Sequence, residues 1–119
     1  MQYLLMIYSN ENRMKDATPE EMGAFMGAYR SFTEGIIADG NYVGGEALQP
    51  TSTATCVSVN AGKTITTDGP FIETKEQLGG YYLVEAKDLD EAIEIAAKIP
   101  SAAFGTIEVR PIMDYTKMG

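Results

Sequence analysis

The sequence contains no histidine and only one cysteine, Cys56, among its 119 residues. Without histidine, the chain lacks the side chain that most often moves protons near neutral pH and most often binds zinc. Acid–base chemistry must therefore rely on a carboxylate, a tyrosine, a lysine or Cys56, in an environment that shifts its pKa. The Gly-Gly pairs at 44–45 and 79–80 lack the spacing of a phosphate-binding loop. We therefore expect no metal and no cofactor.

Basic residues are scarce: 9 lysines and arginines stand against 17 aspartates and glutamates, a net charge of −8. Such a surface repels phosphate backbones and anionic lipids, so we expect no direct binding of nucleic acid or membrane. Long hydrophobic runs are also missing. The apolar run at residues 3–8 is too short to span a membrane and has no basic residues before it, which excludes a signal peptide. The lone cysteine rules out an internal disulfide and indicates a reducing cytoplasm.

The pattern of the chain predicts one domain over residues 1–119. A strand at 3–8 is followed by a helix that begins at Thr18-Pro19-Glu20-Glu21, a capping-box sequence, and ends near Gly40. Its apolar positions, expected to face the core, are Met22, Phe25, Met26, Tyr29, Phe32, Ile36 and Ile37. Short strands follow at 42–48, 51–59 and 63–67, and the last two are joined by a hairpin turn at 60–62.

A further strand at 81–86 precedes a second helix, which Asp88 caps with Glu91 at the third position and Pro100 stops. The apolar stripe of this helix is predicted as Ala92, Ile93, Ala96 and Ile99, and a strand at 106–110 closes the chain. The order is β-α-β-(β-β)-β-α-β. Right-handed crossovers place both helices on one face of a sheet, so we predict an α+β fold, a ferredoxin-like sandwich with an added β-hairpin.

The strands at 3–8 and 81–86 are apolar on both faces, although the helices can cover only one. Strands of this kind need cover on both sides. Because no further helix remains, the simplest cover is a second copy of the same sheet. The sequence therefore predicts a homodimer whose sheets pack face to face, a dimeric α+β barrel.

The stretch DGPFIETKEQLGGYY, residues 68–82, is the candidate functional segment. Asp68 with the following Gly-Pro can be explained as a turn that stops a strand. The ten residues at 70–79 are long for a connection in a compact domain, and long ordered loops are often functional. If Phe71 anchors the loop, Asp68 is held beside Glu73 and Lys75, which share one face of an extended segment. Both interpretations remain open from the residues alone.

Other candidates have equally simple structural explanations. Glu46 follows Gly44-Gly45, where a strand can bend or admit another backbone or a ligand, but it also fits an exposed acid at a strand end. Lys75 and Arg110 could bind an anion or be ordinary surface residues. Cys56 lies in a strand of small residues and is interpreted as packing, because no histidine can activate it.

Five stretches carry a resemblance to a known family: LLMIY, GGEAL with its threonine-rich strand, TDGPFIETKEQLGGYY, DLDEAIEIAAKIP and IEVRPI. The chain resembles the YCII-related proteins, in particular their bacterial DGPF branch, named for the tetrapeptide that is here Asp68-Gly69-Pro70-Phe71. The resemblance implies a ferredoxin-like fold paired as a dimeric α+β barrel, with an unassigned biochemical role. The histidine–aspartate pair proposed as an active site in the wider family cannot be carried over to a chain without histidine.

We expect Asp68 to be the catalytic acid or base of a small-molecule site at the DGPF loop, with Lys75 orienting an anionic group. The other expected substrate-binding residues are Glu46, Phe71, Glu73 and Tyr81. The DGPF branch pattern also contains Glu76, Gly79 and Gly80. Genes of this branch often accompany extracytoplasmic-function sigma factors, so the resemblance also implies an alternative: a non-enzymatic regulatory or interaction module with a sigma-factor partner.

Overall fold

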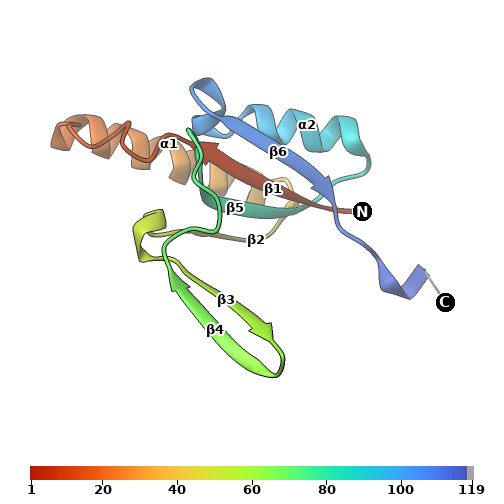
Figure 1. Ribbon diagram of the computed structural model, residues 1–119. Helices are drawn as coiled ribbons and strands as arrows, with labels where there is room; N and C mark the ends of the chain where they lie inside the picture. The colour runs from red at the N-terminus through yellow and green to blue at the C-terminus, as the bar shows by residue number, and fades with distance from the viewer. Residues whose placement is uncertain (118–119) are drawn as a thin grey trace.

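The computed structural model describes residues 1–117. Its main sheet has four antiparallel strands in the order β2 (Tyr42–Ala47), β5 (Gln77–Glu85), β1 (Gln2–Ser9) and β6 (Thr106–Pro111). Both long helices cover one face of this sheet (Figure 1). The architecture is α+β and ferredoxin-like, and the predicted order of helices and strands is confirmed.

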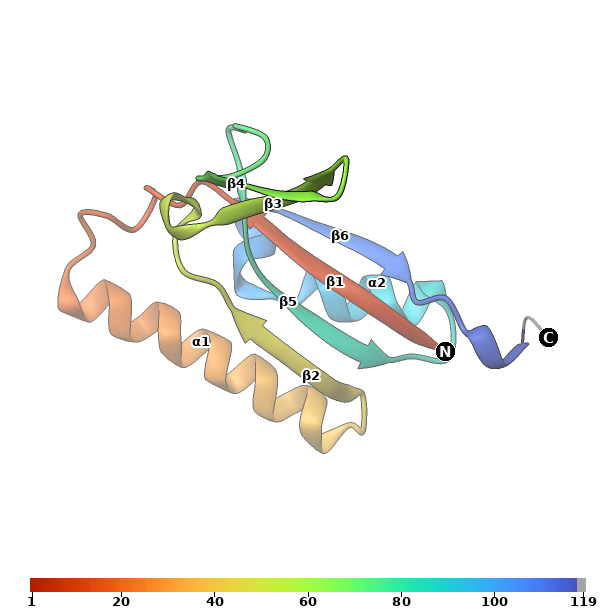
Figure 2. The same cartoon turned by 60° about the horizontal axis from the view of Figure 1, so that its bottom comes forward.

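The predicted hairpin forms a separate two-stranded sheet of β3 (Thr55–Asn60) and β4 (Lys63–Asp68). It projects away from the body on the side opposite the helices (Figures 1 and 2). Its turn is where the sequence placed it, with positive φ at both Ala61 (52°) and Gly62 (79°). We call β3, β4 and their turn the arm. The predicted strand at 51–59 begins later than expected, because residues 51–53 form a short 3-10 helix.

Helix α1 (Pro19–Ala38) begins as predicted: the Glu21 N–H donates to Thr18 Oγ1 (3.1 Å), and the Thr18 N–H donates to Glu21 Oε1 (3.4 Å). The prediction that its whole apolar stripe is core is wrong. Only Phe32 and Ile36 are buried, and the exposed members of the stripe are Met22, Met26 and Ile37. The first turns of α1 extend past the end of the sheet, so they have no strand beneath them (Figure 2).

Helix α2 (Leu89–Ala97) begins at the predicted cap, where the Glu91 N–H donates to Asp88 Oδ1 (2.9 Å). Its buried stripe differs from the prediction at one position, because Ile95 is buried and Ile93 is 49% exposed. Ala92, Ile95, Ala96 and Ile99 follow the spacing of a single helical face, which Ile93 leaves.

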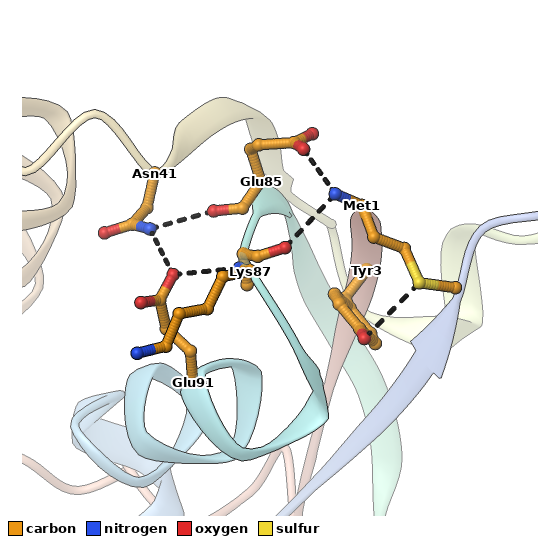
Figure 3. Close-up of polar contacts among 7 residues, drawn as sticks. Met1, Tyr3, Asn41, Glu85, Lys87 and Glu91 are labelled. Carbon is orange, nitrogen blue, oxygen red and sulfur yellow. Dashed lines mark hydrogen bonds and ion pairs between the residues drawn. The ribbon is translucent and has the colours of Figure 1, made fainter.

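A polar cluster joins the end of β5 to α2 and to the link that follows α1 (Figure 3). Asn41 Nδ2, in the link between α1 and β2, donates to the Glu85 carbonyl (2.8 Å) and to Glu91 Oε1 (3.2 Å) on α2. The Met1 amino group donates to Glu85 Oε1 (2.5 Å). These bonds connect the last residue of β5 to the helix layer, at the end of the sheet that is remote from the arm.

The core lies between the helices and one face of the sheet. Along β1, Tyr3, Leu5 and Ile7 are buried against the helices, whereas the alternating Leu4, Met6 and Tyr8 are half-buried on the other face. Along β5, Val84 is buried in the core, and Leu83 pairs with Leu4 on the other face. We call the surface without helices the open face.

The chain exposes more surface than its mass requires. A compact protein of 12.9 kDa exposes about 6,300 Å² and has a radius of gyration of about 13.5 Å. This chain exposes 8541 Å² and has a radius of gyration of 16.7 Å. The projecting arm contributes to this expanded shape (Figure 1).

Candidate functional site

The DGPF segment lies at the base of the arm, where β4 ends. Gly69 adopts a φ of +95°, a conformation that favours glycine. Its N–H donates to the Ala54 carbonyl (2.7 Å), and its carbonyl accepts from Cys56 Sγ (3.2 Å). Cys56 therefore helps to fix the backbone of this segment.

The connection from the arm to β5 is shorter than predicted, because β5 begins at Gln77. It is held by its own polar contacts: Thr74 Oγ1 donates to the Glu76 carbonyl, and Gln77 Nε2 donates to the Thr74 carbonyl (2.5 Å). Thr106 Oγ1, at the start of β6, donates to Glu76 Oε1 (3.1 Å). The loop is therefore tied to the edge of the main sheet.

A groove of about 320 Å³ runs beside this loop, lined by Thr51, Ser52, Pro70, Ile72, Glu73, Thr74 and Gln77. Glu11 borders the same region, where its carboxylate accepts from the Thr51 hydroxyl (2.6 Å) and N–H (3.0 Å). These two bonds favour the charged form and lower the pKa of Glu11. The groove therefore has polar walls and an acidic neighbour, which the sequence did not indicate.

The six predicted site residues fall into two groups. Asp68, Phe71, Glu73 and Lys75 all lie at the arm's base or on the loop, and all four are exposed. Within residues 1–117, Asp68 makes no side-chain hydrogen bond or ion pair. Phe71 is 87% exposed, so it does not anchor the loop inside a single chain.

Glu46 and Tyr81 form the second group, away from the loop. They are direct partners in the β2–β5 ladder, on the open face that Leu83 and Leu4 share. The glycines beside them are close to a neighbouring backbone, as predicted: a Cβ on Gly45 would lie 2.8 Å from the Tyr81 carbonyl oxygen. The structure therefore places Glu46 beside Tyr81, but in a different part of the fold from Asp68.

A second cavity, of about 520 Å³, lies between α1 and the β2–β5 edge of the sheet. Two pairs of hydroxyl groups line it, Tyr29 with Ser101 (2.5 Å) and Thr33 with Tyr82 (2.6 Å). No sequence pattern marks these four residues as a site, because each pair joins positions far apart in the chain. The only available signal was Gly79-Gly80 next to Tyr82, a strand segment with little side-chain volume.

Neither a metal site nor a membrane span is found in the part of the chain that the structure describes. No three His, Cys, Asp or Glu side chains among residues 1–117 are grouped so that they could hold a metal ion. Neither helix in this range is long and apolar enough to cross a membrane.

Comparison with known proteins identifies the family. The chain is 35% identical over 117 residues to an uncharacterized protein of Rhizobium meliloti (strain 1021), an alignment that covers 97% of this chain and 94% of that protein. The family model of the YCII-related domain matches residues 1–116. This chain therefore belongs to the family of YCII-related domain proteins.

Proposed function

We propose that the protein acts as a homodimer that binds a small molecule at the DGPF loop and uses carboxylate acid–base chemistry there. The observation that carries this proposal is the position of the DGPF segment at the base of an exposed apolar arm. Val57, Val59 and Phe71 are 64%, 68% and 87% exposed, beside an open face that has no helix over it. Soluble monomers rarely leave so many apolar side chains uncovered in one region.

A second copy is the occupant that best fits this surface. The chain exposes about 2,200 Å² more than a compact protein of its mass, whereas a standard interface buries about 800 Å² on each partner. Two open faces in contact would form the dimeric α+β barrel, and each arm would reach across the edge of the other subunit. The groove beside the loop would then be covered from above by the second chain.

Three residues of this segment take the proposed chemical roles. Asp68 is an exposed carboxylate at the end of β4, and carboxylates commonly act as general acids and bases. Lys75 on the same loop supplies a cation for an anionic substrate group, and Glu73 lines the groove itself. We assign proton transfer to Asp68 and orientation of the substrate to Lys75.

The proposal is tested with light scattering and a metabolite screen by thermal shift on the full chain. We expect a dimer at micromolar concentration and at least one ligand that raises the melting temperature. In Asp68→Asn the affinity or activity should fall by about 100-fold while stability changes by less than about 1 kcal/mol, because the amide keeps the shape but cannot titrate. Asp68→Ala is the companion variant and should lose the same function. If Asp68→Asn binds and reacts like the wild type, Asp68 has no role in the chemistry.

The exposed arm also supports a second candidate, an interaction module that binds a sigma factor through Val57 and Val59. A monomeric wild-type protein at micromolar concentration, together with direct binding to a purified extracytoplasmic-function sigma factor that Val59→Asp abolishes, would favour this candidate over the dimer.

A further inference from the structure

The cavity between α1 and the β2–β5 edge has the composition of a binding site, and it is separate from the DGPF groove. None of the residues that line the DGPF groove also lines this cavity. Its volume of about 520 Å³ lies within the range of about 300–1,000 Å³ that is usual for small-molecule sites. It is formed within a single chain, so it does not depend on dimerisation.

Aromatic rings form its walls. Phe25 and Tyr29 of α1 contact each other edge to face, with ring centroids 5.1 Å apart, and Tyr42 and Tyr82 from the sheet are 6.4 Å apart. Such walls favour an apolar ligand, and a planar ring in particular, because aromatic rings pair edge to face or offset-stacked.

Glycines keep the cavity open on its sheet side. A Cβ on Gly80 would lie 2.8 Å from the Glu46 carbonyl oxygen, so a side chain cannot be added there without moving the β2 backbone. Gly45 is restricted in the same way by the Tyr81 carbonyl. The close approach of β2 and β5 therefore requires glycine at both positions, and no side chain from them fills the space below α1.

The hydroxyl pair of Thr33 and Tyr82 offers a hydrogen-bond acceptor to a ligand. Thr33 Oγ1 donates its hydrogen to the Tyr29 carbonyl (2.9 Å), so the bond between Thr33 and Tyr82 (2.6 Å) must be donated by the Tyr82 hydroxyl. The hydrogen of Tyr82 is then used, and the free lone pair of its oxygen can accept a hydrogen bond from a ligand.

The hydroxyl pair of Tyr29 and Ser101 offers a hydrogen-bond donor to a ligand. The Tyr29 and Ser101 hydroxyls are 2.5 Å apart and have two hydrogens, but their mutual bond uses only one. Neither oxygen has another side-chain partner within residues 1–117, and Ser101 is 3% exposed. The ordinary pKa of 10.0 already keeps the Tyr29 hydroxyl protonated at neutral pH, and burial raises this pKa further. One hydroxyl hydrogen therefore remains available to an acceptor.

The charges of the lining residues also limit which ligands the cavity can bind. No lysine or arginine is among the residues that line the cavity, and Glu46, the one charged residue among them, pairs with Tyr81 on the open face. An anion would be desolvated there without a partner, which is unfavourable.

We propose that this cavity binds a small, neutral, aromatic molecule that carries one hydrogen-bond donor and one acceptor. Tyr82 accepts from the ligand's donor, the Tyr29–Ser101 pair donates to its acceptor, and the rings of Phe25 and Tyr42 flank its apolar part.

The test is NMR titration of the isotope-labelled full chain with three neutral probes, benzamide, para-hydroxybenzamide and para-hydroxyacetophenone, and with benzoate as the anionic control. We expect saturable shifts at the amides of Gly45, Gly80 and Ser101 for at least one neutral probe, with a dissociation constant of about 1 mM. Benzoate should bind at least about 5-fold more weakly, because it is charged and finds no cation.

Three variants locate the site. Ala47→Phe places a ring at the cavity's exposed rim and should abolish the shifts. Tyr82→Phe removes the acceptor together with the hydrogen bond to Thr33 and should weaken binding by about 3- to 10-fold. Tyr3→Phe removes a tyrosine hydroxyl elsewhere in the core and should bind like the wild type. If Ala47→Phe does not fold, Tyr82→Phe compared with Tyr3→Phe decides alone.

Several results would overturn the proposal. They are the absence of saturable shifts for all three neutral probes at about 10 mM, shifts that map to the arm instead of the cavity, and equal binding to Tyr82→Phe and the wild type. None of these results depends on Asp68 or on the dimer, so the DGPF proposal and this one fail separately.

Discussion

Leu83→Asp is the sharpest test of the idea that a second copy covers the open face. The sequence could not assign Leu83 to a face, but the structure places it opposite Leu4, away from the helices, while the neighbouring Val84 is buried in the core. In a single chain Leu83 is only half-buried, so the charge can reach water and the unfolding free energy should fall by about 1 kcal/mol or less.

In the dimer the same aspartate would be buried between two sheets, twice by symmetry. Removing one partner of a buried ion pair costs about 3–5 kcal/mol because it leaves a charge buried and unpaired. A comparable cost for each of the two aspartates, about 6–10 kcal/mol together, would weaken the dimer by about 10⁴- to 10⁷-fold.

The assay is light scattering over a dilution series, combined with urea unfolding of the same samples. We expect Leu83→Asp to be a folded monomer at concentrations where the wild type is a dimer. Ile93→Asp is the matched control, since it places the same charge at an exposed apolar site on α2, and it should stay dimeric. A Leu83→Asp protein that dimerises as tightly as the wild type would refute the face-to-face arrangement.

Three further predictions follow from the described contacts. Ile99→Ala should lower the unfolding free energy by about 2–5 kcal/mol in urea titrations, because Ile99 is 1% exposed in the core; a loss below 1 kcal/mol would mean that the core is wrongly placed. Ala61→Gly should stabilise the arm by about 0.5–1 kcal/mol, seen as slower amide exchange in β3 and β4, because Ala61 has a positive φ; faster exchange would contradict it. Because burial raises the pKa of Tyr29 above its ordinary value of 10.0, its contribution to stability should be full below that value and lost as pH rises through the folded pKa. Urea midpoints across alkaline pH should show this loss, and Tyr29→Phe should remove this part of the dependence.

The sequence determined the order of the elements and the starts of both helices, because these depend on neighbours in the chain. The Thr18 capping box, the Asp88 cap and the Ala61-Gly62 turn involve residues within four positions of each other, and all are present in the structure. The Asp68-Gly69-Pro70 sequence likewise fits a turn that stops a strand, and β4 ends at Asp68. Local chemistry of this kind needs no knowledge of the rest of the fold.

Tertiary structure decided which residues meet. Periodicity showed that Leu83 and Val84 point to opposite faces, but only the packing of the helices selected Val84 for the core. The hydroxyl pair of Tyr29 and Ser101 joins positions 72 residues apart, so no local pattern could indicate it. Such contacts depend on crossovers and strand register, which bring distant segments together. They leave no regular spacing of residues that could be recognised in a single sequence.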